Sequence, residues 1–250
     1  YRDFNDYTVR TDLNWPVTQV GADIYSEAWN VKEPAIIETP DHNFVHVWSD
    51  YEWNGANTDG WVIRYAIIDR FGQTIKEPTL LSPFYDVAGY ATGQWSTALA
   101  VSPDGKVGVV WQKGLGNPSG LENQNIWFAI INPSGSLAYG PVNLTNNEAW
   151  GSWQAGNMVQ LYDPDISASA DNRFFITWEK MNQSADTYDI FYTIRQSSGA
   201  VVVPVTAMTA SVSGTFYFPT AQIALSGNRF FVTYAYYHLS GQNYVRELLY

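Results

Sequence analysis

The chain has 250 residues, of which 46% are hydrophobic, and it contains no cysteine. This composition is enough to bury a substantial core, and the lack of cysteine excludes disulfides, thiolate zinc sites and a cysteine nucleophile. The formal net charge of −11 argues against nucleic acid and anionic membrane surfaces as partners, because both are bound through Lys and Arg. No apolar run is long enough to cross a bilayer, so we expect no membrane insertion.

Aromatic residues make up 16% of the chain and charged residues only 15%, a balance that favours β-strands. We find no helical periodicity of useful length. In chain order, the first predicted strands are Tyr7–Arg10 and Pro16–Thr18, which match Tyr192–Arg195 and Pro204–Thr206. We therefore expect the chain to begin with the last two strands of a repeated unit.

The repeated unit opens with a short strand, a tight turn and a second strand that ends in an aromatic residue. This pattern occurs in Pro34–Trp48, Thr97–Trp111, Pro164–Trp178 and Pro219–Tyr234. The turns hold Asp41-His42, Asp104-Gly105, Asp171-Asn172 and Gly227-Asn228. These residue types tolerate positive φ and predict two-residue hairpin turns. The aromatic residues that end the pattern, called the marker aromatics below, are 63, 67 and 56 residues apart.

A second pair of strands follows the marker aromatic and completes a four-stranded antiparallel unit. The third strands are Ile63–Ile68, Ile126–Ile131 and Ile190–Ile194, and the fourth strands end near Pro78, Pro141 and Pro204. Four-stranded units at such a period indicate an all-β fold, a β-propeller, with a β-sandwich as the alternative. We assign Trp48, Trp111 and Trp178 to packing between blades, because they recur in register.

The repeat predicts one propeller domain or segment, with three full blades and two partial ones. The full blades are 33–96, 97–163 and 164–218, and the partial blades are 1–32 and 219–250. Both ends of the sequence carry a candidate third strand, so a blade that closed one ring from the two ends would receive two of them. This excess predicts a segment of a larger propeller. The alternatives are a closed four-blade ring with one strand displaced, or strand exchange between subunits.

One turn resembles a known family of repeats. The stretch Ser102-Pro-Asp-Gly-Lys-Val-Gly-Val-Val-Trp111 resembles the strand–turn–strand element of TolB-like propellers, and Thr39–His42 is a partial match. The Asp-box of sialidases, in which Ser-x-Asp-x-Gly precedes a Trp, is similar in position but is not matched. The resemblance implies a propeller architecture and carries over no catalytic residue.

The connections of the unit differ in length between the two faces of the disc. Connections between the first and second strands, and between the third and fourth, are tight, whereas the others are long, such as Ser49–Gly60 and Pro83–Ser96. Long loops on one face mark where function is expected. The candidate ligand-binding aromatics of these loops are Trp53, Tyr85, Tyr90, Trp95, Trp150, Trp153, Tyr217, Tyr236 and Tyr237.

Aromatic rings beside carboxylates and amides suit sugars, whose C–H faces stack on rings while their hydroxyls need fixed hydrogen-bond partners. We therefore expect an extracellular or cell-surface propeller that binds carbohydrate or a protein ligand. We favour binding over catalysis. One alternative is a glycoside hydrolase or polysaccharide lyase at the central channel, using carboxylates such as Glu52, Asp165, Glu179 or Asp189. The other is a structural module that packs against a neighbouring domain or subunit.

The sequence predicts no cofactor. The three His residues have no spacing that suits a metal site. Asp163 and Asp165 offer hard oxygen ligands on either side of a proline and are the candidates for a structural calcium ion.

Overall fold

The structure is a computed structural model. It describes residues 31–53, 59–82, 92–116, 122–146, 159–182, 187–209, 215–223, 230–240 and 243–249. Every regular element in these ranges is a β-strand, and the same ranges hold no helix long and apolar enough to span a membrane. The strands predicted for residues 7–18 lie outside the described residues.

The strands form four antiparallel sheets, each built from strands consecutive in the chain. The first sheet contains β1 (Val31–Glu38), β2 (Phe44–Trp53), β3 (Asp59–Ile68) and β4 (Thr74–Ser82). The second contains β5 (Thr92–Val101), β6 (Val107–Gly116), β7 (Glu122–Ile131) and β8 (Leu137–Asn143). The third contains β9 (Leu161–Ala168), β10 (Arg173–Asn182), β11 (Thr187–Gln196) and β12 (Val201–Ala207). The fourth contains β13 (Thr215–Ile223), β14 (Phe230–Ser240) and β15 (Asn243–Leu249).

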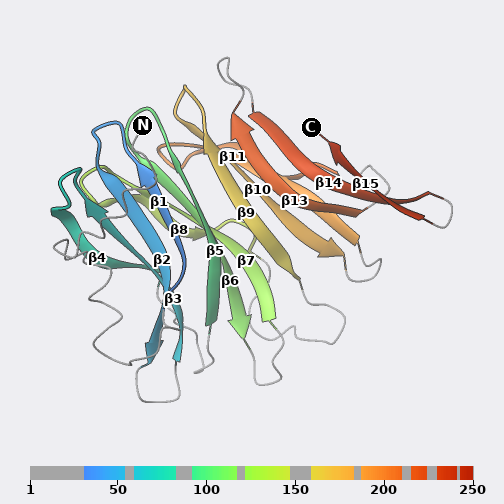
Figure 1. Ribbon diagram of the computed structural model, residues 1–250, viewed down its shortest axis with the longest axis horizontal. Coiled ribbons are helices and arrows are strands. Elements are labelled where there is room, and N and C mark those ends of the chain that lie inside the picture. Colours follow the sequence, from blue (N-terminus) through green and yellow to red (C-terminus); the bar gives the residue numbers. More distant parts are fainter. Residues whose placement is uncertain are drawn as a thin grey trace, which may run out of the picture.

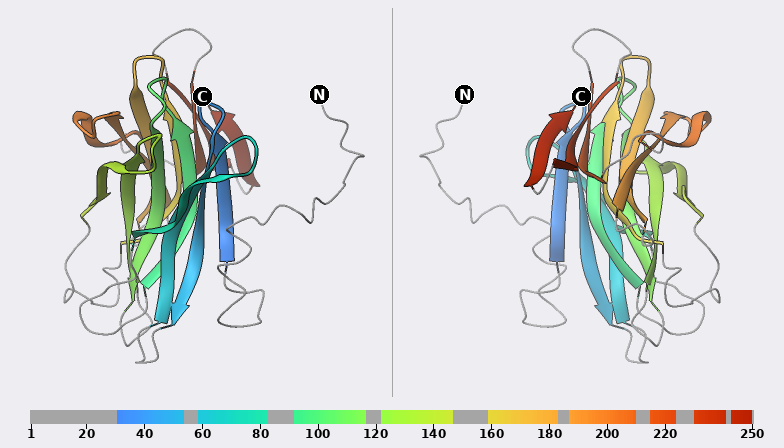
Figure 2. Two further views of the ribbon diagram at one scale, coloured as in Figure 1. Left: turned by 90° about the vertical axis from the view of Figure 1, so that its left-hand side faces the viewer. Right: turned by 90° about the vertical axis from the view of Figure 1, so that its right-hand side faces the viewer.

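The sheets stand side by side as successive blades of a β-propeller (Figures 1 and 2). The first strand of each sheet is innermost: β5 contacts both β1 and β9, and β13 contacts β9. The last strands, β4, β8 and β12, form the outer edges of the first three sheets. The all-β propeller predicted from the repeat is thus confirmed.

The described tight turns share one geometry, and it is not the predicted two-residue hairpin. In the turn after β1, the Thr39 N–H donates to the Asn43 carbonyl oxygen over 2.8 Å and the His42 N–H donates to the Thr39 carbonyl oxygen over 2.9 Å. Of the residues in that turn, only His42 has a positive φ, of 62°. This is a three-residue loop, a type I turn followed by one left-handed residue. The equivalent left-handed residues of the other described turns are Gly72, Gly105, Gly135, Asn172 and Gly199.

A hydroxyl residue at the start of each described turn between first and second strands stabilises that turn. Its side chain donates to the carbonyl oxygen four residues ahead, and it also hydrogen-bonds the Asp two residues ahead. The hydroxyl-to-carbonyl distances are 3.0 Å for Thr39, 2.9 Å for Ser102 and 3.2 Å for Ser169. The carboxylate partners are Asp41, Asp104 and Asp171. The Ser-Pro-Asp-Gly pattern therefore has a local function in shaping the turn.

The apolar core lies between neighbouring sheets, and the marker aromatics are part of it. Trp111 belongs to a buried cluster with Val47 and Ile63 of the first sheet. Trp178 belongs to a second cluster with Val110 and Ile126 of the second sheet, which are the equivalents of Val47 and Ile63. The predicted inter-blade packing of these two tryptophans is confirmed, and the repeated contacts show that the sheets are related by a regular rotation.

Each innermost strand contains a β-bulge opposite the marker aromatic. In β5, Trp95 pairs with Gln112 and Ala98 with Val110, so two residues of β5 oppose Trp111 alone. The same two-to-one mismatch occurs at residues 33–34, 163–164 and 218–219, opposite Trp48, Trp178 and Tyr234. Extra residues of this kind bend a strand and redirect its side chains. Pro34, Thr97, Pro164 and Pro219, from which the sequence repeat was counted, are therefore bulge residues inside longer strands.

The second and third strands run further than predicted. The β2–β3 ladder continues from Trp48↔Arg64 to Trp53↔Asp59, because main-chain pairing does not end where the hydrophobic alternation ends. The expectation that Trp53, Trp95, Tyr217, Tyr236 and Tyr237 lie in loops is therefore wrong, since all five are strand residues. Asp163 and Asp165 likewise lie in β9.

Candidate functional site

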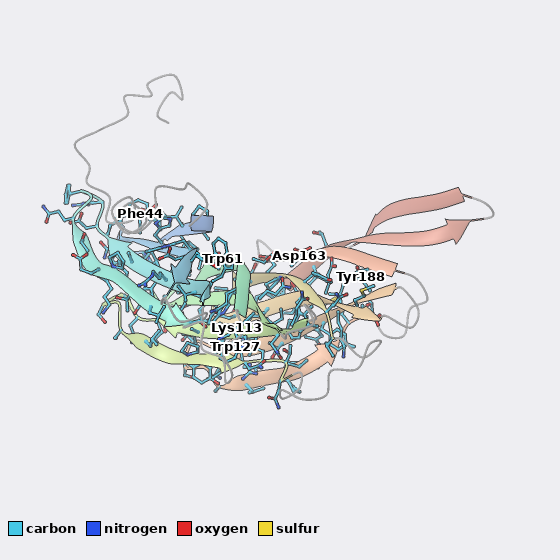
Figure 3. All side chains as sticks on the ribbon, turned by 90° about the horizontal axis from the view of Figure 1, so that it is seen from below. Phe44, Trp61, Lys113, Trp127, Asp163 and Tyr188 are labelled. Atoms are coloured by element: carbon cyan, nitrogen blue, oxygen red, sulfur yellow. The ribbon has the colours of Figure 1, made fainter. Side chains whose placement is uncertain are left out.

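The two ends of the sheets differ less than the sequence predicted, because the connections from second to third strands leave only two to five residues between paired strand ends. The described tight turns lie at one end, and the strands that precede and follow the connections between sheets finish and begin at the other, the lower end in Figure 1. We call the latter the long-loop end; there the innermost strands begin and the second strands finish. Figure 3 looks onto this end.

The predicted ligand-binding aromatics are only partly located. Trp53 is the last residue of β2, Trp95 lies in β5, Tyr217 in β13, and Tyr236 and Tyr237 in β14. All of these positions are in the half of a strand nearer the long-loop end. Tyr85, Tyr90, Trp150 and Trp153 lie outside the described residues.

Polar residues follow each marker tryptophan toward the long-loop end, and they are buried. Ser49, Gln112 and Glu179 are 0%, 1% and 2% exposed. They occupy equivalent positions, one residue beyond Trp48, Trp111 and Trp178. Burying a polar group is costly unless it has a partner, so this layer marks where the apolar core of each blade gives way to polar chemistry.

In the third sheet this polar layer meets a pair of aromatic rings. Tyr162 of β9 pairs with Glu179 of β10, and Tyr188 of β11 pairs with Met181, so their side chains project from the same face of the sheet. The rings of Tyr162 and Tyr188 are 6.0 Å apart between centroids, tilted by 50°. Asp163, next along β9, is the first residue of the bulge and has a φ of 46°. We call Tyr162, Asp163, Glu179 and Tyr188 the third-sheet cluster; Figure 3 labels Asp163 and Tyr188.

The cluster shifts the proton affinities of its members. Partial desolvation of the carboxyl raises the pKa of Asp163 above its usual 3.8, although the residue as a whole is exposed. Burial, and then the neighbouring Tyr188, Glu179 and Asp163, raise the pKa of the Tyr162 hydroxyl above its usual 10.0. The partly desolvated Asp163 carboxyl and the neutral Tyr162 phenol are adjacent residues of β9. Together they can both donate and accept hydrogen bonds.

Two lysines near this end are engaged within the protein. The Lys113 ammonium lies 4.9 Å from the ring centroid of Trp127, and the Lys180 ammonium lies 5.5 Å from that of Phe191. In the first sheet an ion pair fills the equivalent position, where the Arg64 Nε lies 2.9 Å from an Asp50 carboxylate oxygen. These cation–π contacts and this ion pair hold each second strand on its third strand.

The first sheet has its own aromatic pair at the long-loop end. Tyr51 and Trp61 face each other across β2 and β3, with ring centroids 5.4 Å apart and planes at 65°. Both rings are half-buried. Aromatic pairs therefore flank the second sheet on both sides at this end.

The calcium prediction has no further support in the geometry. One Asp165 carboxylate oxygen accepts a hydrogen bond from the Ile166 N–H over 2.8 Å. Within the described ranges no three His, Asp or Glu side chains are grouped so that they could hold a metal ion. A calcium ion bound by Asp163 and Asp165 stays a prediction.

The sequence pattern identified Glu179 as a candidate carboxylate but did not single out Tyr162 or Tyr188 as ligand-binding residues. Both lie in stretches predicted to be loops, where Tyr162 was counted among the loop aromatics, and they face each other only because β9, β10 and β11 pair in this register. The two-to-one bulge opposite Trp178 was the missed signal. It recurs at the marker in every sheet, but a pattern of residue types does not show pairing register.

No protein-family model matches the sequence, and no curated protein is similar to it. Solved structures are similar in fold. An α-L-arabinanase from Penicillium chrysogenum, complexed with arabinobiose, is 14% identical with a TM-score of 0.51, over 89% of this chain and 62% of that one. An ulvan lyase from a new family of polysaccharide lyases is 8% identical with a TM-score of 0.53, over 87% of this chain and 52% of that one.

A protein of unknown function from Dyadobacter fermentans is 13% identical with a TM-score of 0.54, over 87% of this chain and 65% of that one. The chain thus spans between about half and two-thirds of the length of these three proteins. Identities this low show the fold alone. What the chain shares with these three proteins is its fold, which here is a β-propeller of antiparallel blades.

Proposed function

We propose that the protein binds carbohydrate at the long-loop end of its sheets, with the third-sheet cluster as a principal contact. The observation that carries this proposal is the Tyr162–Tyr188 ring pair beside the carboxyl groups of Asp163 and Glu179. Rings offer a surface to the C–H face of a sugar, and carboxylates accept hydrogen bonds from its hydroxyls. The shared fold with an arabinobiose-bound arabinanase and an ulvan lyase supports the same class of ligand.

Charge favours a neutral sugar polymer over an anionic one. The chain carries a net charge of −11, and two carboxyl groups belong to the cluster. Lys113 and Lys180 are directed at aromatic rings of their own sheets. An anionic polysaccharide would be repelled from such a surface at low ionic strength. The protein would meet a polysaccharide outside the cell, which fits the expected extracellular or cell-surface location.

The test is calorimetric titration with debranched arabinan as the neutral polymer and ulvan as the anionic one. We expect the protein to bind arabinan and Tyr188→Ala to bind it roughly tenfold more weakly, since about 1.4 kcal/mol of lost stacking is a factor of ten. Phe71→Ala is the matched control, because Phe71 is an aromatic residue 68% exposed at the tight-turn end. Equal affinities of the wild type and Tyr188→Ala would contradict this site, and lack of binding to both polymers would contradict carbohydrate binding.

Glycoside hydrolysis is the second candidate, favoured by the carboxyl of the exposed residue Asp163, whose pKa is raised, beside the Tyr162–Tyr188 ring pair. Hydrolysis uses one carboxyl group that stays protonated as the acid and a second that is ionised. Asp163 would be the acid, whereas Glu179, which is 2% exposed, is too buried to contact a sugar as the second group. Release of reducing ends from arabinan, abolished by Asp163→Asn, would support hydrolysis; undiminished release by that variant would exclude Asp163 as the acid.

A further inference from the structure

The bulges of the second and third sheets hold two residues in a backbone conformation that side chains other than glycine rarely adopt. Ser96 has a φ of 53° and Asp163 a φ of 46°. Each is the first residue of its bulge, opposite Trp111 and Trp178 respectively. Left-handed residues within strands are strained, and such strain persists mainly where function needs the side chain it redirects.

These two residues come from neighbouring innermost strands. β5 and β9 contact each other directly, and their sheets are related by the regular rotation that places Trp111 and Trp178 in equivalent inter-sheet clusters. Equivalent bulges therefore lie at the same level along the propeller. This level is the long-loop half of the inner strands, where Tyr162 meets Tyr188.

We propose that Ser96 and Asp163 form one binding unit across the boundary between the second and third sheets, and that they bind neighbouring hydroxyls of a single sugar chain. This inference rests on the proposed function and extends its site to a second sheet. Ser96 is half-buried and takes part in an interaction within the protein. A hydroxyl has one proton to donate and two acceptor sites, so it retains capacity for a ligand.

Glycine substitution separates a binding role from a structural one. Glycine adopts positive φ without strain, so Ser96→Gly and Asp163→Gly should leave the denaturation midpoint unchanged or raise it. If the strained residues contact ligand, both variants should nevertheless bind debranched arabinan at least about tenfold more weakly. His42→Gly is the matched control, because His42 has a φ of 62° in a turn at the opposite end. It should keep its full affinity for arabinan.

A double-mutant cycle tests whether the two residues act on one ligand. Ser96→Ala removes the hydroxyl, and Asp163→Asn replaces one carboxylate oxygen with an NH2 group and removes the charge. For adjacent contacts to one sugar chain, the double variant should bind arabinan with an affinity that departs at least about threefold from the product of the single effects. If the effects of the two single substitutions on arabinan affinity are additive, Ser96 and Asp163 do not form one binding unit.

The outcomes distinguish this inference from the function on which it rests. If Tyr188→Ala loses arabinan affinity while Ser96→Gly and Ser96→Ala bind as the wild type does, the second-sheet contact is wrong and the proposed function stands. If the wild type fails to bind arabinan and ulvan alike, both are overturned. Weaker binding by the glycine variants together with a lowered denaturation midpoint would mean that the bulges are structural, which also overturns the inference.

Discussion

The indole N–H of Trp111 in β6 donates a hydrogen bond to the side-chain oxygen of Gln94 in β5 over 3.1 Å. The side-chain nitrogen of Gln94 donates in turn to the carbonyl oxygens of Trp61, over 2.9 Å, and Ser82, over 3.3 Å. Since Trp61 and Ser82 belong to the first sheet, one fully buried glutamine links the marker aromatic of one blade to the main chain of the next.

Gln94→Leu should destabilise the protein. The leucine would leave the buried Trp111 N–H and the two carbonyl oxygens without this partner, at a cost of about 2–3 kcal/mol. The equivalent position of the third sheet holds Leu161, so the side chain fits the fold. Chemical denaturation monitored by tryptophan fluorescence would measure the change in the free energy of unfolding.

Gln112→Leu is the matched control for that variant. Gln112 is equally buried, but its side-chain nitrogen finds no hydrogen-bond partner among the described residues. Replacing it should change the free energy of unfolding by less than about 1 kcal/mol. Equal losses for the two variants would show that burial, and not the hydrogen-bonded link, governs both positions.

Tyr65→Phe should weaken the contact between the first and second sheets at the tight-turn end. The Tyr65 hydroxyl, buried, donates to the Gly135 carbonyl oxygen over 2.8 Å. Without it a carbonyl oxygen loses its partner while the ring packing is kept, so we expect a loss of about 1–2 kcal/mol in the free energy of unfolding. Tyr139→Phe is a suitable comparison, because the Tyr139 hydroxyl makes no hydrogen bond within the part of the chain that the structure describes. Equal losses in the free energy of unfolding for the two variants would refute the link.

Asp104 should make stability depend on acid pH. Burial opposes its ionisation, but hydrogen bonds from Ser102, Lys106 and Ser197 together hold its pKa below the usual 3.8. A carboxyl with a lowered pKa adds stability above its unfolded-state value, and this stability is lost as the pH falls through the folded-state value. The wild type should therefore exceed Asp104→Asn in denaturation midpoint at pH 7, and the gap should narrow below about pH 4. A gap that is constant from pH 7 to pH 3 would contradict this account.

Asp163 should have the opposite dependence. Burial raises its pKa, so the folded state favours the protonated form, and the associated stability is lost as the pH rises through the folded-state value. Asp163→Asn keeps a residue type that tolerates positive φ and removes the charge. Its denaturation midpoint should match that of the wild type near pH 3 and exceed it at pH 7. A variant less stable than the wild type at pH 7 would show that the carboxylate is stabilised where it lies.

The sequence predicted the blade architecture because four marker aromatics and their turns recur at similar spacing, and packing between blades needs those residues. The functional surface was harder to predict. Trp53 and Trp95 were placed in loops because the hydrophobic alternation stops near the marker, whereas backbone pairing continues beyond it. The encounter of Tyr162 with Tyr188 depends on strand register, which residue types alone do not determine.

The inner strands both pair with their neighbours and carry side chains near the axis, and the bulge opposite each marker aromatic lets the side chain change while the pairing stays the same. The pairing around it is made by the main chain and recurs in all four sheets, whereas the sequence changes its first residue from Glu33 to Ser96, Asp163 and Phe218. Substitution at this position leaves the ladder and the inter-blade core in place. A propeller built this way can exchange the chemistry it offers near its axis one blade at a time, so ligand preference can diverge among proteins whose blades remain superimposable.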